Sequence, residues 1–385
     1  MGFSARGLGA LTTLLGSLLL ASAPLHAAPE APATTDTIRI GQTAALSGPL
    51  AELGTELRDG ADAYLKWINS KGGIHGKKIE LVSEDDAYVP ERAVQNVKKQ
   101  LDNDKVLAFL GIMGTANYWA VMPLLDERKV PSVAPFTGSD DLRNQSSPYT
   151  FWVRASYGDE AEKIVRQLTT TGVTRIAVFY QNDTLGISGV DGVTKALRKR
   201  NLTIAAKGSF DKNSLDVGPA VRSISAADPQ AVIMFSTYKA TAAFVRKLKQ
   251  SGSAAQLFAV SVVGVKALAN ELGPDATGIA ISQVMPYPGN AALPLVREFE
   301  ALPKPLQPKA GLTYTTLEGF ISAKVLVEGL RRAGPQPTRE KLTTALESLR
   351  NYDTGGYTID FGPGKRQGSH FAEVTILGSG GKLMH

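Results

Sequence analysis

The sequence predicts an α/β protein made of two doubly wound parallel-sheet lobes. The first observation is a strand at 38–41, a glycine-rich turn, an amphipathic helix ended by glycines, and a second strand at 77–82. This order is one βαβ unit. The second observation is that strands and helices of similar length alternate in two rounds, which gives parallel sheets with helices on both faces. The third is length, since the chain exceeds the roughly 250–300 residues that one core supports.

The N-terminus has the pattern of a cleaved secretory signal. Arg6 is the only charged residue before a short apolar run at 8–20, and small residues follow at 21, 23, 27 and 28. The run is shorter than the ~17 residues that a membrane span needs. We expect cleavage after Ala27, leaving 28–36 as a disordered Pro/Ala/Thr-rich stretch. No Cys follows the apolar run, so no lipid can be attached there.

Hydrophobic patterns place the remaining elements in chain order. The first round continues with a strand at 106–112, a helix at 116–128, and strands at 131–136 and 149–154. The second round predicts strands at 175–180, near 207 and at 231–235, with helices at 188–200, 217–226 and 241–250. A helix at 313–333 and tail strands at 357–361 and 371–377 complete the pattern.

Two turns of the first βαβ unit resemble those of a known family. Ser47-Gly48-Pro49 follows the first strand, and Gly72-Gly73-Ile74-His75-Gly76 joins the helix to the second strand. Both recur in the leucine/isoleucine/valine-binding family of periplasmic solute-binding proteins, and the resemblance covers nearly all of the chain after the leader. It implies a type I periplasmic binding fold whose lobes are joined by a three-segment hinge. The expected organisation is 1–27 signal peptide, 28–36 disordered stretch, 37–155 with 284–362 as lobe 1, and 156–283 with 363–385 as lobe 2.

Two loops after strands are the main candidates for ligand binding. In open α/β sheets, ligands bind beyond the carboxyl ends of the strands. Loops 111–117 and 135–140 are rich in Gly and hydroxyls, and each leads into a predicted helix N-terminus, which suits an anion. The candidate residues are Met113, Gly114, Thr115, Thr137, Gly138 and Ser139.

The resemblance implies a ligand carboxylate at these loops. Thr115 matches the family's hydroxyl on the first loop. A family Thr falls on Gly138, so a neighbouring hydroxyl or backbone N–H must replace it. The alternative is that Thr115 and Ser139 only cap helices. Some family members join the acidic loop to the first ligand loop by a disulfide, but Tyr88 and Gly114 occupy those positions and packing alone must hold the loops.

The second lobe departs further from the family pattern. Tyr238 matches an aromatic residue that closes over the ligand, whereas Leu185 stands where an aromatic is usual. Ser261 stands where amino-acid binders carry an acid for the α-ammonium group, and a buried ammonium without a counter-charge costs several kcal/mol. Either another acid, such as Glu318, takes that role or the ligand lacks an amine. Tyr314, in the same segment as Glu318, completes the candidate set.

Composition argues against other functional classes. Without residues 1–27 the chain has 41 basic and 36 acidic side chains, a net charge of +5, and the basic residues are scattered without aromatic platforms. We therefore expect no nucleic-acid role. The sequence has no Cys and only four His, none spaced for a nucleophile or a common zinc site, so neither an enzyme nor a cofactor is expected.

The sequence thus predicts a periplasmic, monomeric binding protein without a lipid anchor. By the resemblance, it captures a small carboxylate-bearing solute by hinge closure and passes it to the permease and ATPase subunits of an ABC importer. The solute is a hydrophobic amino acid such as a branched-chain one, or a related carboxylate without an amine. A sensory protein that docks on a chemoreceptor or sensor kinase would have the same fold and remains the alternative.

Overall fold

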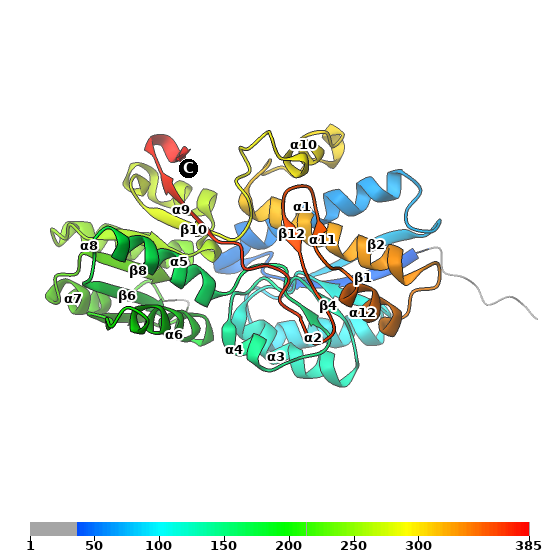
Figure 1. Ribbon diagram of the computed structural model, residues 1–385, viewed down its shortest axis with the longest axis horizontal. Coiled ribbons are helices and arrows are strands. Elements are labelled where there is room, and N and C mark those ends of the chain that lie inside the picture. The colour runs from blue at the N-terminus through cyan, green and yellow to red at the C-terminus, as the bar shows by residue number, and fades with distance from the viewer. Residues whose placement is uncertain (1–36, 213, 385) are drawn as a thin grey trace, which may run out of the picture. The chain divides into compact units, whose positions relative to one another are not determined.

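The computed structural model describes residues 37–212 and 214–384. The predicted signal peptide and the 28–36 stretch lie outside these residues. Two α/β lobes, each with its own sheet, make up the described chain, as the sequence predicts (Figure 1). No helix of the described ranges is long and apolar enough to cross a membrane.

The first sheet is wholly parallel, with strand order β2-β1-β3-β4-β5. Its strands are β1 (Thr37–Ala44), β2 (Lys78–Asp85), β3 (Ala108–Leu110), β4 (Ser132–Val133) and β5 (Thr150–Phe151). Its helices are α1 (Ala51–Ser70), α2 (Pro90–Asp102), α3 (Thr115–Glu127), α4 (Asp140–Asn144), α10 (Pro294–Glu300), α11 (Tyr314–Ala333) and α12 (Arg339–Glu347). A small antiparallel pair is formed by β11 (Tyr352–Asp353) and β12 (Thr358–Ile359).

The second sheet has the order β14-β13-β10-β9-β8-β6-β7. Its strands are β6 (Ile176–Gln181), β7 (Lys207–Phe210), β8 (Ala231–Phe235), β9 (Gln256–Ala259), β10 (Ala280–Gln283), β13 (Glu373–Leu377) and β14 (Leu383–Met384). Its helices are α5 (Tyr157–Thr170), α6 (Thr184–Arg198), α7 (Gly218–Ala226), α8 (Tyr238–Gln250) and α9 (Val265–Leu272). The first five strands in chain order are parallel, while β13 and β14 add antiparallel pairs at one edge.

Short 3₁₀ turns occupy several connections. They are η1 (Gly48–Leu50), η2 (Ser261–Val263), η3 (Gly273–Ala276), η4 (Lys304–Leu306) and η5 (Ser379–Gly381).

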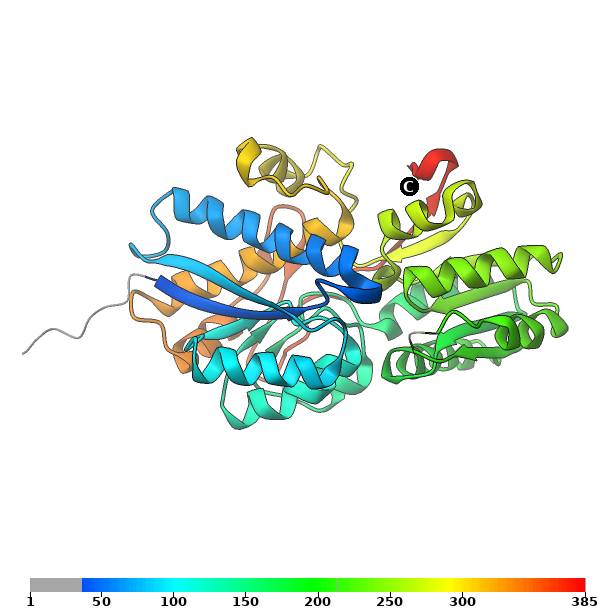
Figure 2. The same cartoon turned by 180° about the vertical axis from the view of Figure 1, so that it is seen from behind.

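The chain passes between the sheets three times, between β5 and α5, between β10 and α10, and between β12 and β13. The last crossing is the segment before β13, which runs from one sheet to the other in both views (Figures 1 and 2). These crossings form the three-segment hinge. The residue numbers at which the sequence divides the lobes stay predictions.

Several predicted bounds are wrong. β4 is confined to Ser132–Val133, because beyond it only the isolated pairing of Met113 with Phe136 continues the ladder. Helix α6 begins at Thr184 and not at Ser188. The Asp183 carboxylate caps this helix by accepting hydrogen bonds from Leu185 N and Gly186 N. The sequence also did not single out β9, which is short and lacks a clear period.

Candidate functional site

The loops after β3 and β4 lie together at the edge of the first sheet. Gly114 has φ +100°, a left-handed conformation that favours glycine, and its N–H donates to Phe136 O at 3.2 Å. Thr115 begins α3, and its hydroxyl lies 2.8 Å from that of Thr137. Ser139 N donates to the Thr137 hydroxyl at 3.2 Å. The structure thus brings both predicted loops into one polar cluster.

Tyr157, which sequence reasoning missed, enters this cluster from the start of α5. Its N–H donates to Gly138 O at 2.6 Å, and its hydroxyl lies 3.4 Å from Thr115 Oγ1. A Cβ on Gly138 would lie 2.3 Å from the Tyr157 ring, so in this arrangement the family's Thr would not fit at position 138. The hydroxyls of Thr137 and Tyr157 are the neighbouring groups that can replace it. Tyr157 follows a predicted strand as the other two loops do, and that signal could have identified it.

Ser139 has a capping role in the structure. Its hydroxyl accepts a 3.5 Å hydrogen bond from Leu142 N at the start of α4. Thr115 differs, because the cap residue of α3 is Gly114, which brings no side chain to the free N–H groups of the first turn. The N-terminus of α3 therefore keeps donors and the positive end of its helix dipole directed at the loop cluster.

A small cavity lies between the two lobes beside this cluster. Its volume is about 10 Å³, close to the minimum for one water molecule. Its walls are formed by Leu50, Tyr88, Met113, Gly114, Thr115 and Phe136 from the first lobe and by Tyr157, Leu185, Ser236, Thr237 and Val262 from the second. This volume is too small for an amino acid or a small carboxylate, so such a ligand fits here only if the lobes separate.

Four of the predicted residues line the cavity and the others lie behind or beyond it. Met113, Gly114, Thr115 and Leu185 form part of its walls, and Thr137, Gly138 and Ser139 lie in the loop behind Thr115. Tyr238 follows the lining residue Thr237, and Ser261 precedes the lining residue Val262. Tyr314 lies apart, in a groove beside α9 and the C-terminal strand, where its hydroxyl donates to Glu373 at 3.3 Å.

Tyr88 and Gly114 are packed against each other, as expected for a loop pair without a disulfide. A Cβ on Gly114 would lie 2.7 Å from the Tyr88 ring. Lys212, from the loop after β7, places its Nζ 4.0 Å from the ring centre and donates to Tyr88 O at 2.9 Å. Tyr88 therefore also connects the two lobes at the edge of the cavity.

Glu318 and Ser261 belong to a buried charge cluster that sequence reasoning did not find. Arg154, on the first crossing and 1% exposed, pairs with Glu318 at 3.3 Å and donates to the Ser261 hydroxyl. Glu160 of α5 accepts hydrogen bonds from Ser261 N at 2.8 Å and from the Ser261 hydroxyl at 2.9 Å. Ser282 also donates to Glu160.

Burial governs the ionisation of this cluster. Loss of water raises the pKa of Glu318 to about 7, although Arg154 opposes the shift and Glu160 adds to it. Burial also raises the pKa of Glu160, against the effect of Arg154. Two carboxyl groups thus share one guanidinium at the base of the hinge, and the cluster joins both lobes to the first crossing.

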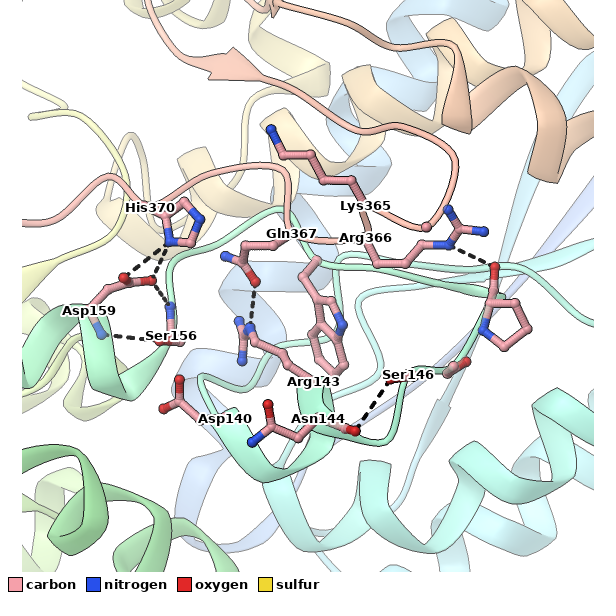
Figure 3. A pocket seen from close by; sticks show the side chains of 14 residues that line it. Asp140, Arg143, Asn144, Ser146, Ser156, Asp159, Lys365, Arg366, Gln367 and His370 are labelled. Atoms are coloured by element: carbon pink, nitrogen blue, oxygen red, sulfur yellow. Dashed lines mark hydrogen bonds and ion pairs between the residues drawn. The ribbon is translucent and has the colours of Figure 1, made fainter. Parts of the chain in front are cut away.

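A larger groove of about 640 Å³ lies on the hinge, where the first and third crossings meet (Figure 3). Arg143 donates to Gln367 Oε1 at 2.6 Å and to Ser139 O at 2.9 Å, and to further carbonyls. Burial lowers the pKa of Arg143 to about 10. His370 Nδ1 lies 3.1 Å from Asp159 Oδ1, and Figure 3 shows the ring turned toward this carboxylate. Because these groups satisfy one another, the groove is better explained as hinge structure than as a ligand site.

Comparison with known proteins agrees with this geometry. The sequence profile of the family described as periplasmic binding protein matches residues 37–382. The chain belongs to the periplasmic binding protein family. The resemblance drawn from the two turns of the first βαβ unit is thereby confirmed.

Relatives of this periplasmic binding protein share most of its length. A substrate-binding periplasmic protein from Ralstonia solanacearum has 39% identity and a TM-score of 0.85, over 90% of this chain and 99% of that one. A possible leucine/isoleucine/valine-binding protein from Rhodopirellula baltica has 31% identity and a TM-score of 0.85, over 91% and 96%. The leucine-specific-binding protein of Salmonella typhimurium is 25% identical over 298 residues, 76% of this chain and 79% of that protein.

Proposed function

We propose that this periplasmic binding protein captures a small carboxylate-bearing solute between its lobes and delivers it to an ABC importer. The observation that carries the proposal is the cluster of Thr115, Thr137 and Tyr157 hydroxyls at the uncapped N-terminus of α3. Hydroxyl and backbone donors at a helix N-terminus favour a carboxylate. The name of the Salmonella relative supports a solute of amino-acid size.

Binding would proceed by closure of the hinge. The open form exposes the donors of α3, and the solute then joins the first-lobe loops to Tyr157, Leu185 and Val262 of the second lobe. A ligand stabilises the closed form only by its higher affinity for that form. In this mechanism the protein performs no chemistry on the solute, which should be recovered unchanged.

A thermal-shift screen of hydrophobic amino acids, aliphatic and aromatic carboxylates and amides would identify the ligand. A ligand at 100 times its Kd should add about 2.7 kcal/mol of stability. Deletion of the gene should then abolish uptake of that solute. Normal uptake with a lost response to the solute would instead favour the sensory role.

The carboxylate subsite is tested by Thr115→Val. The valine keeps the shape but loses the hydroxyl, so affinity for the best ligand should fall by roughly 1.5–3 kcal/mol, the typical value for a hydrogen bond to a charged group. Isothermal titration calorimetry would measure this loss. Thr170→Val is the control, because that hydroxyl bonds only within the exposed end of α5. Equal affinity of the Thr115 variant and the wild type would remove Thr115 from the site.

A further inference from the structure

We infer that the solute carries a carboxylate and no ammonium group, so that its second end is apolar or uncharged. This inference rests on the proposed function and narrows it to one chemical class. It depends on which groups face the cavity and on where the neighbouring acids are engaged.

The described residues that line the cavity include no charged side chain. Five of these residues, Tyr88, Thr115, Tyr157, Ser236 and Thr237, carry hydroxyl groups, and all the other wall residues that the structure describes are apolar or glycine. Leu50, Met113 and Phe136 of the first lobe face Leu185 and Val262 of the second. These walls suit a hydrocarbon body attached to a single polar end.

Ser261 occupies the position at which an acid was expected to pair with the ammonium group of an amino acid. Ser261 gives its hydroxyl and its N–H to Glu160 and accepts from Arg154, so its polar groups face the buried cluster. Glu318, the substitute acid considered from the sequence, pairs with the same Arg154. Both carboxyl groups therefore face the guanidinium of Arg154, and neither lines the cavity.

Two other acids near the cavity are also engaged. Asp86 accepts from the Thr43 hydroxyl at 2.9 Å and from Tyr88 N at 2.8 Å. Asp183 caps α6 and accepts from Gln181 at 2.6 Å. An α-ammonium enclosed by these walls would lose its water without gaining a carboxylate.

The decisive measurement uses pairs of ligands that differ only in the amine. We expect 4-methylpentanoate to bind at least about 100-fold more tightly than L-leucine, because the amino acid buries an unpaired charge. For the same reason, 3-phenylpropanoate should bind more tightly than L-phenylalanine by a similar factor. Titration calorimetry on the wild-type protein gives both ratios. Equal or tighter binding of the amino acids would overturn the inference while leaving the proposed function intact.

The uncharged 4-methylpentanamide separates the two proposals. It should bind much more weakly than 4-methylpentanoate if the loops hold a carboxylate. If the amide binds as well as the acid, or if no carboxylate in the screen binds, the proposed function fails and this inference fails with it.

A charge placed on the wall should reverse the preference. Thr237 lines the cavity and is the N-cap of α8 without a side-chain cap bond, so Asp fits there as a good capping residue. Thr237→Asp should move the leucine to 4-methylpentanoate affinity ratio at least tenfold toward leucine. Thr237→Asn, with the same shape and no charge, should leave the ratio near that of the wild type. Equal ratios in the two variants would contradict an unpaired ammonium as the reason for discrimination.

Discussion

At the scale of single residues, Arg154 explains why two carboxyl groups can remain buried at the hinge. Its guanidinium faces Glu160 of the second lobe and Glu318 of the first. Breaking a buried pair leaves an uncompensated charge, which is far more costly than losing a surface pair. The cluster therefore constrains the first crossing, and its net charge depends on whether Glu318 is protonated.

Glu318 should make the stability of the protein depend on pH. Its pKa is raised from 4.5 to about 7 in the fold, so the folded state holds the proton more tightly than the unfolded state. The stability that this tighter proton binding adds is fully present below pH 4.5 and is lost as pH rises through about 7. Arg154 and Glu160 face the Glu318 carboxyl group, and Tyr357 lies close enough to interact electrostatically with it.

The variant Glu318→Gln removes this titration. Between pH 5 and pH 8, the free energy of unfolding of the wild type should therefore fall relative to that of the variant, as measured by urea denaturation at several pH values. Glu328→Gln, on the same helix, controls for the loss of an acid from α11. Parallel pH curves for wild type and Glu318→Gln would show that Glu318 titrates near its usual range.

At the scale of elements, the first lobe depends on the close approach of α1 and α11, which lie side by side in both views (Figures 1 and 2). A Cβ on Gly60 would lie 2.0 Å from Thr316 O, and one on Gly319 would lie 2.1 Å from Leu57 O. Both obstacles are backbone atoms, so neither can move aside cheaply. The approach also fixes the start of α11, where the Thr313 hydroxyl donates to Glu56 at 2.7 Å.

Gly60→Ala should destabilise the protein by about 1–3 kcal/mol, because the methyl group forces the two helices apart. In an unpacked helix the same change would stabilise by up to ~1 kcal/mol, so the sign of the effect distinguishes packing from helix propensity. Gly218→Ala is the control, since its nearest obstacle is a flexible Asp216 oxygen at 3.3 Å. Urea midpoints would measure both variants, and an unchanged midpoint for Gly60→Ala would refute the close approach.

At the scale of the whole described chain, a few contacts hold the lobes closed around the cavity. One is the hydrogen bond that Lys212 Nζ donates to Tyr88 O. Another is the 3.3 Å hydrogen bond that Asp140 N donates to Ser188 Oγ. Such contacts change the equilibrium between open and closed forms. They therefore affect the apparent affinity for a ligand that they need not touch.

Lys212→Met should weaken the closed form while keeping much of the side-chain volume. Loss of one partly exposed hydrogen bond is worth about 1 kcal/mol, or roughly fivefold in affinity, and it should appear mainly as faster dissociation. Stopped-flow measurement with the best ligand would give the rates. Lys207→Met, on an exposed position of β7, is the matched control. Equal dissociation rates in the two variants would exclude a closing role for Lys212.

Local sequence patterns determined most of the secondary structure and one part of the candidate site. Apolar runs and glycine stops located β8 at 231–235 and the long helix α11 to within one residue. Because parallel strands end at a common edge, the same patterns singled out loops 111–117 and 135–140 as the candidate site, and the Thr115 and Thr137 hydroxyls of these loops are 2.8 Å apart. Residues 1–27 carry the pattern of a signal peptide, which stays a prediction.

Only the tertiary structure decided the contacts between segments far apart in the chain. Tyr157 reaches Thr115 because Gly138 leaves it room, and Arg154 meets Glu318 across more than 160 positions of sequence. Neither contact has a periodic signal, since hydrophobic patterns report which face of an element is buried and not which partner it meets. The extent of β4 was likewise set by neighbouring strands. Secondary structure here follows from local physics, whereas the charge environment of the cavity follows from packing between the lobes.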